Sequence, residues 1–151
     1  MPELKILNNR EIKEILKLVE RQWNAKVKMD YGFLKNTKGR IFIISKDIAG
    51  IDTSKLRLNS AGMYFCEIDN KGIRLSIEGS QLIGSNATKN VVELDEDEVK
   101  KWFKGEDLEK NCDGCSGFVI LRHKNDFLGT GKYANGKILN YVGKSRRINA
   151  I

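Results

Sequence analysis

The chain has 151 residues, of which 40% are apolar and 31% charged, and only one is a proline. This composition is typical of one globular domain or of two small ones, and it excludes a disordered or a collagen-like chain. No apolar run approaches the roughly 18 residues that a membrane-spanning helix needs, and no secretory signal is recognisable. We therefore expect a cytoplasmic protein that does not bind membranes.

Lys and Arg outnumber Asp and Glu by 27 to 20, and the excess is distributed unevenly. Residues 1–89 have a net charge of +6, residues 90–115 of −5, and residues 116–151 of +6 again. A solvated surface would explain an ordinary basic stretch. The last segment, however, holds seven basic side chains against one acidic one, with Tyr133 and Tyr141 among them. Cations attract phosphate and flat rings stack on exposed bases, so the pattern favours a nucleic-acid partner.

The first half is predicted to contain both helix and strand. An amphipathic helix is expected over residues 9–23, because its apolar side chains recur every three or four positions, and Asn8 or Asn9 can cap it. A buried strand is predicted over 40–45 and a hairpin over 62–75.

A short helix is predicted next, over 76–84, with Ser76 as its cap and Gly84 as its left-handed stop. The small polar residues that follow mark a domain boundary. This boundary predicts one domain over 1–88 and a second over 89–151.

The second half opens with a predicted strand over 91–94. Asp95 and Glu98 form a capping box that starts a helix, and Gly105 ends it. Three closely spaced strands are expected to follow, over 118–123, 127–133 and 137–142. The last two are joined by an Asn-Gly pair, which is a strong hairpin signal.

Residues able to perform chemistry are sparse. As a general base, His123 would need a nucleophile such as Cys112 or Ser116, and a structural or surface role is the simpler interpretation. Cys112 and Cys115 form one C-x-x-C pair in a loop, which makes a small metal-binding or thiol-redox protein the alternative function. Zinc normally takes four ligands, and the other candidates, Cys66 and His123, are not at ligand spacing. Two loop thiols or a heat-stabilising disulfide are the simpler interpretation. The abundance of Lys and Ile with few Gln favours an archaeal or thermophile-like source.

Residues 131–137 nearly match the phosphate-binding loop G-x-x-x-x-G-K-[ST]. Ile138 stands where the magnesium-binding hydroxyl is required, and no helix is predicted to follow. We interpret the stretch as a hairpin, and the sequence indicates no cofactor. Gly129 and Gly131 are expected to allow close backbone approach or a bend in the strand.

The basic C-terminal end offers the clearest binding surface. Strand alternation predicts Lys137, Leu139 and Tyr141 on one face. In the tail, Arg146 and Arg147 can each bind a phosphate through two N–H donors of the guanidinium group. We therefore expect the cations of this end to share one side of the domain.

Several segments of this end carry a resemblance to a known family. They are FVILRH at 118–123, FLGTGK at 127–132, GKILN at 136–140 and KSRR at 144–147. Together they resemble a PUA domain, most closely the C-terminal RNA-binding segment of Sun-type rRNA 5-methylcytosine methyltransferases. The likeness covers about residues 60–150, and the two-part layout is similar to that of Nip-type ribosome-biogenesis proteins.

The resemblance implies an α+β fold, in which an N-terminal α/β domain precedes a PUA-like mixed β pseudo-barrel. It also implies binding to structured RNA, either rRNA or tRNA, during maturation or modification. The RNA contacts that it implies are Arg122, Lys132, Lys137, Asn140, Lys144, Arg146 and Arg147, and the aromatic pattern adds Tyr141.

One departure from the family concerns catalysis. Sun-type methyltransferases carry a catalytic Pro-Cys and a glycine-rich nucleotide loop, whereas the only proline here is Pro2. We therefore expect a protein without catalytic residues of its own, which delivers a separate RNA-modifying enzyme to its RNA. A third possibility is a protein-interaction module whose acidic segment 93–109 binds a basic partner.

Overall fold

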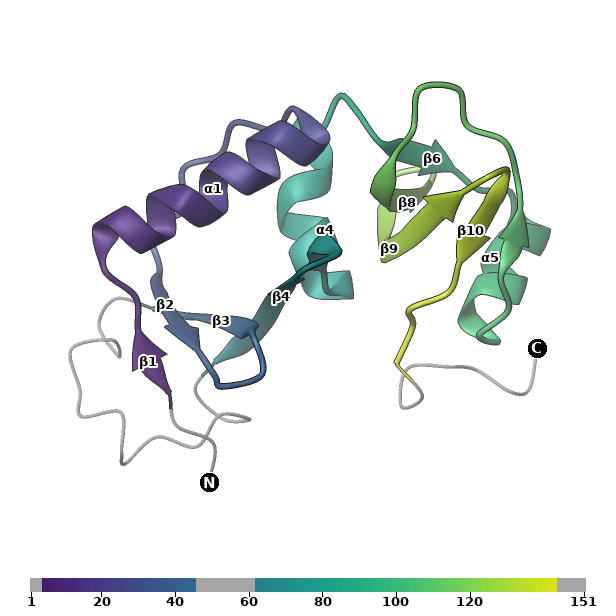
Figure 1. Cartoon of the computed structure of the whole chain (residues 1–151). Helices are drawn as coiled ribbons and strands as arrows, with labels where there is room; N and C mark the ends of the chain where they lie inside the picture. The colour runs from purple at the N-terminus through teal and green to yellow at the C-terminus, as the bar shows by residue number, and fades with distance from the viewer. Residues whose placement is uncertain (1–3, 46–61, 144–151) are drawn as a thin grey trace.

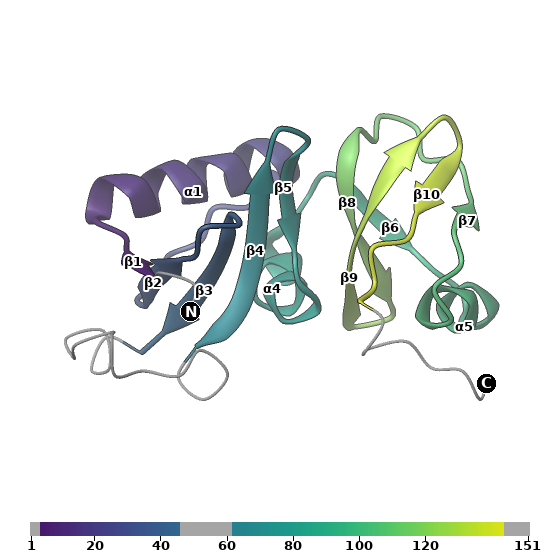
Figure 2. The same cartoon turned by 60° about the horizontal axis from the view of Figure 1, so that its bottom comes forward.

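The computed structural model describes residues 4–45 and 62–143, and the predicted α+β class is confirmed. Two five-stranded sheets lie side by side, with α1 across one face of the first sheet and α4 between the two sheets (Figures 1 and 2). Within these ranges, no helix combines the length and the apolar character that crossing a bilayer requires.

The first sheet is antiparallel throughout. Its strands, in spatial order, are β1 (Lys5–Ile6), β2 (Gly32–Lys35), β3 (Arg40–Ile44), β4 (Met63–Asp69) and β5 (Gly72–Leu75). The predicted strand over 40–45 and the hairpin of β4 and β5 are confirmed. β1 and β2 had no sequence prediction, because both are short and neither shows a sustained alternating pattern.

Helix α1 (Asn9–Trp23) confirms the predicted amphipathic helix and buries Val19 and Trp23 against the sheet. Asn8 caps it through a reciprocal pair of hydrogen bonds. The Glu11 backbone N–H donates to Asn8 Oδ1 at 2.9 Å, and the Asn8 backbone N–H donates to Glu11 Oε1 at 3.1 Å.

Helix α4 (Ile77–Ile83) begins at its predicted cap, Ser76. The predicted left-handed stop at Gly84 is wrong, because this residue has a right-handed backbone (φ −56°, ψ −40°) and opens the 3-10 turn η2 (Gly84–Asn86). Glycine is needed at this position for packing, because a Cβ at Gly84 would overlap the ring of Phe127 in the second sheet.

The second sheet is mixed. Its strands, in spatial order, are β6 (Val91–Glu93), β8 (Gly117–His123), β9 (Asp126–Ala134), β10 (Lys137–Leu139) and β7 (Leu108–Glu109). β6 runs parallel to β8, and the other pairs are antiparallel. Helix α5 (Glu96–Phe103) starts with the predicted capping box of Asp95 and Glu98 and buries Trp102. In Figure 2 it lies at the end of the molecule away from α1.

The turn between β9 and β10 confirms the hairpin interpretation of residues 131–137. Asn135 and Gly136 occupy it with φ of 50° and 78°, as a two-residue turn of this kind requires. Gly131 allows close approach, as expected, because a Cβ there would lie 2.7 Å from the ring of Trp102. The last strand is shorter than predicted: β10 ends at Leu139, so Tyr141 lies beyond it.

The hydrophobic cores show how the two sheets meet. The core under the first sheet includes Phe118 and Ile120 of β8, while a second core gathers around Trp102. The first core therefore crosses from the N-terminal to the C-terminal half. The division into domains over 1–88 and 89–151 stays a prediction.

Candidate nucleic-acid interface

Arg122, a predicted RNA contact, lies near the end of β8 and already has a partner. Its Nε donates to Glu93 Oε2 at 2.8 Å, while Glu93 Oε1 accepts the Lys124 backbone N–H at 2.8 Å. These hydrogen bonds, the one from Arg122 foremost, lower the pKa of Glu93. A phosphate would have to compete with this carboxylate for Arg122.

Asn140, another predicted contact, is used inside the fold. Its Nδ2 donates to the carbonyl oxygens of Trp102 and Glu106, both at 2.8 Å. Its Oδ1 accepts the Val142 N–H at 2.8 Å, and its own N–H donates to Asp107 Oδ1 at 2.7 Å. These bonds connect the segment after β10 to α5 and the loop that follows it.

Of the remaining predicted cations, the structure describes Lys132 and Lys137. Lys137 is exposed at the start of β10, with Glu109 as its neighbour across the strand pair. Lys144, Arg146 and Arg147 lie outside the described residues. Among the predicted residues that the structure describes, only Lys132 and Tyr141 are brought together, at the ring of Phe118.

Lys132 and Tyr141 meet at the ring of Phe118. Lys132 Nζ lies 5.9 Å from the centre of that ring, and the Tyr141 ring lies 5.3 Å from it. The guanidinium of Arg74, from β5, lies over the Tyr141 ring, with its Cζ 4.8 Å from the ring centre. A cation from the first sheet thus stacks on a ring from the segment that follows the second sheet.

The same arrangement continues into the first sheet. Arg74 Nη2 donates to Glu67 Oε2 at 2.7 Å, and Arg40 Nε donates to Glu67 Oε1 at 3.3 Å. The Arg40 Cζ lies 5.6 Å from the centre of the Tyr64 ring. We name this connected row the junction track, and its members are Lys132, Phe118, Tyr141, Arg74, Glu67, Arg40 and Tyr64.

A cleft of about 350 Å³ opens beside the junction track. Its lining includes Arg40, Tyr64, Arg74, Gly129, Thr130 and Tyr141, and it therefore draws on both sheets. Burial raises the pKa of Tyr64, so its phenol stays neutral at physiological pH.

The sequence prediction missed Arg40, Tyr64 and Arg74. The excess positive charge of residues 1–89 was the signal for them. No local pattern could place Arg74 on Tyr141, because their contact depends on how the two sheets pack together.

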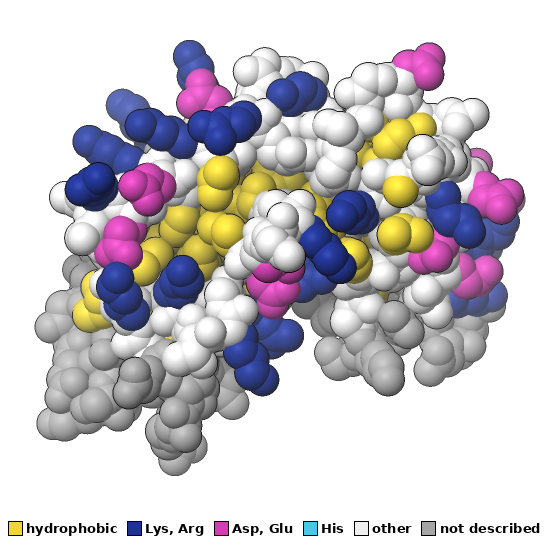
Figure 3. All heavy atoms as spheres, in the orientation of Figure 1, with side chains coloured by type: hydrophobic (Ala, Val, Ile, Leu, Met, Phe, Trp, Pro, Cys, Tyr) yellow, Lys and Arg dark blue, Asp and Glu magenta, His cyan; other side chains and the backbone are white. Residues whose placement is uncertain are grey.

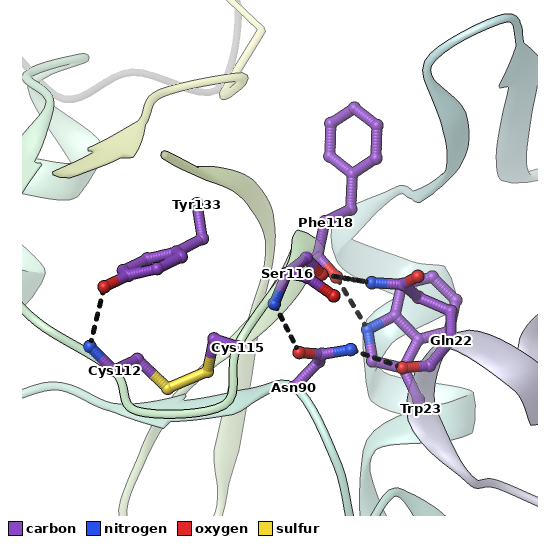
Figure 4. The surroundings of a disulfide bond; sticks show 8 residues. All are labelled: Gln22, Trp23, Asn90, Cys112, Cys115, Ser116, Phe118 and Tyr133. Carbon is purple, nitrogen blue, oxygen red and sulfur yellow. Dashed lines mark hydrogen bonds between the residues drawn. A yellow bond between two sulfur atoms is a disulfide. The ribbon is translucent and has the colours of Figure 1, made fainter. Parts of the chain in front are cut away.

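The cysteine pair gives no support to a metal site. Cys112 and Cys115 are joined by a disulfide, and the described residues hold no group of three His, Cys, Asp or Glu side chains placed to bind a metal. Figure 4 shows the disulfide beside Tyr133, whose hydroxyl accepts the Cys112 N–H at 3.2 Å.

The third cysteine, Cys66, is buried, and burial raises the pKa of its thiol. His123 has a structural contact, with its Nδ1 2.8 Å from the Leu94 carbonyl oxygen.

The match to a family model defines the class of the C-terminal part of the chain, which is a PUA domain and contains the second sheet. More particularly, residues 89–148 match the family described as the methyltransferase RsmF PUA domain. The resemblance inferred from the sequence is thereby confirmed for this part of the chain.

Several similar proteins share the name ribosomal RNA small subunit methyltransferase F. The chain is 29% identical to the one from Vibrio cholerae and 33% identical to the one from Aeromonas salmonicida, in each case over 86 residues. Each match covers 57% of this chain and 18% of the relative. A match to the Vibrio campbellii protein, at 22% identity, covers 88% of this chain and 28% of that relative. The matched parts of the chain thus span less than a third of the length of these relatives.

Proposed function

We propose that this chain is a non-catalytic RNA-binding module that acts in rRNA modification. The observation that carries the proposal is the match of residues 89–148 to the PUA domain of an rRNA methyltransferase family. The related proteins are named as enzymes that act on the RNA of the small ribosomal subunit. We infer that this chain binds structured RNA of the same kind, and that a separate enzyme supplies the catalysis.

Charge supports the proposal. Residues 116–151 carry seven basic side chains against one acidic one. No ion pair joins Lys132 or Lys137 to another described residue, and Lys137 lines a pocket with Glu106, Asp107 and Glu109, with which a phosphate would compete. The absence of a Pro-Cys dipeptide from the sequence supports a role without methyl transfer of the Sun type.

A titration of a labelled hairpin from small-subunit rRNA tests this function. We expect a Kd of about 1 μM or tighter at ~0.15 M salt, and a weaker one for the double variant Lys132→Gln/Lys137→Gln. The control is Lys100→Gln/Lys101→Gln, which removes the same charge from α5. No binding by the unmodified chain, or an equal loss in both double variants, would count against the proposal.

A further inference from the structure

The junction track crosses from one sheet to the other, and its place in the fold suggests a specific ligand. Lys132, Phe118 and Tyr141 come from the PUA domain, whereas Arg74, Glu67, Arg40 and Tyr64 come from the first sheet. Figure 3 shows Lys and Arg side chains where the two halves meet. A ligand bound along the track would therefore contact both halves.

The track contains both cations and aromatic rings, and each cation lies beside a ring. The Arg40 side chain is 52% exposed and that of Arg74 26%, so both reach solvent while each lies over a tyrosine ring. Guanidinium planes and aromatic rings are the surfaces on which unpaired bases stack in RNA-binding proteins. Phe118 is buried and serves as the support for Lys132 and Tyr141.

Glu67 fixes the two arginines in place. Its carboxylate binds both guanidinium groups and its side chain is only 18% exposed. Side chains held in this way lose little conformational freedom when a ligand binds, which favours affinity. The track contains three cations, Lys132, Arg74 and Arg40, and one carboxylate, Glu67, so it keeps a net positive charge, as a phosphate chain requires. A second carboxylate, that of Glu78, lines the adjoining cleft.

The combination of rings and cations favours unpaired RNA over a duplex. In a duplex the faces of the bases are stacked on each other, and a protein reaches mainly phosphates and 2′-hydroxyls. Only an unpaired strand can offer its base faces to Tyr141, Arg74 and Tyr64. The adjoining cleft of about 350 Å³ is within the size range of small-ligand sites and has room beside both arginines.

We propose that the junction track and its cleft bind a short unpaired segment of RNA. Phosphates contact Lys132 and Arg40, and bases stack against Arg74 and Tyr141. This inference rests on the proposed function for the nature of the ligand, and goes beyond it in naming the site and the single-stranded form. It also assigns RNA contact to the first sheet, outside the region of the PUA match.

The test compares a single-stranded oligouridylate of about eight nucleotides with a blunt RNA duplex. The variant Arg74→Lys keeps the charge but removes the planar guanidinium, and Tyr141→Leu removes the ring. We expect each variant to bind the single strand about tenfold more weakly and the duplex unchanged, since one base stacked on a side chain accounts for an effect of this size. The matched control is Arg10→Lys, an arginine on α1 whose side chain is 90% exposed, and it should leave both affinities unchanged.

The outcomes separate this inference from the proposed function. If the unmodified chain binds neither single-stranded nor hairpin RNA, the proposed function fails. If it binds hairpin RNA but Arg74→Lys and Tyr141→Leu change the two affinities equally, or change neither, only the inference fails.

A second measurement uses only the unmodified protein, so it does not depend on whether a variant folds. The unmodified chain is photocrosslinked to an oligonucleotide that contains 5-iodouridine, and the crosslinked peptides are identified. Crosslinks at Tyr141 or Tyr64 support the proposal. Crosslinks confined to the surface of α5 and β7 would overturn it.

Discussion

The indole Nε1–H of Trp23 donates to the carbonyl oxygen of Phe118 at 3.1 Å, and this bond joins α1 to β8. Gln22 Nε2 donates to the same oxygen at 2.8 Å and to the Ser116 carbonyl at 2.7 Å (Figure 4). Because Phe118 also supports Tyr141, the helix of the first half helps to hold the junction track together.

The variant Trp23→Phe should lower the free energy of unfolding by about 2 kcal/mol, because it removes a buried hydrogen bond and part of a buried ring. Urea denaturation followed by circular dichroism measures this loss. The exposed Lys13→Ala on the same helix is the control. We also expect one cooperative transition, since the first core contains residues of both sheets. Two separate transitions would contradict a shared core.

Asn140→Ala should destabilise the fold and should not weaken RNA binding. The side chain bonds three backbone groups, and its loss leaves the carbonyls of Trp102 and Glu106 without these donors. We expect the free energy of unfolding to fall by about 2 kcal/mol. Gln81→Ala, an exposed amide on α4, serves as the comparison. Unchanged stability together with weaker RNA binding would instead favour Asn140 as an RNA contact.

Glu93→Gln should make the stability less sensitive to acid. The pKa of Glu93 is lowered in the folded protein, chiefly by the hydrogen bond from Arg122, so its proton binds less tightly there than in the unfolded chain. The resulting stability is present above the pKa of the unfolded chain and is lost as the pH falls through the lowered pKa. The pair is exposed, so we expect a difference of at most about 1 kcal/mol between the two proteins near neutral pH, and none in strong acid. Denaturation curves at a series of pH values measure it. If the difference in free energy of unfolding between the two proteins grew as the pH falls, the pair of Glu93 and Arg122 would not be the source of this acid sensitivity.

Removal of the disulfide tests the thiol-redox alternative. A disulfide that spans so few residues stabilises a fold by about 2 kcal/mol at most, so Cys112→Ser/Cys115→Ser should remain folded. We expect its RNA affinity to equal that of the unmodified chain, because the bridge lies outside the junction track. Titration of thiols before and after reduction verifies the pairing. If reduction of the unmodified protein changes RNA affinity more than tenfold, the cysteines have a functional role.

The elements with strong local signals were predictable from the sequence. The capping boxes at Asn8 and Asp95 and the Asn135-Gly136 turn are encoded by neighbouring residues, and all three are present. The role of Gly84 was not predictable, because it depends on Phe127, which lies far along the chain.

The candidate site was only half predictable for the same reason. Lys132 and Tyr141 stand in a visibly basic, aromatic stretch. Their partner Arg74 comes from a different sheet, and only tertiary packing brings it to Tyr141. Charge density likewise could not reveal that Arg122 is bound to Glu93.

The salt dependence of RNA binding tests the account most directly. Affinity for the rRNA hairpin is measured by fluorescence anisotropy at increasing KCl, and log K is plotted against log [KCl]. With Lys132, Lys137 and Arg40 near phosphate, we predict a slope of about −3 or steeper for the unmodified chain, and a slope shallower by about one for Lys132→Gln. A slope near zero would contradict phosphate recognition by this surface.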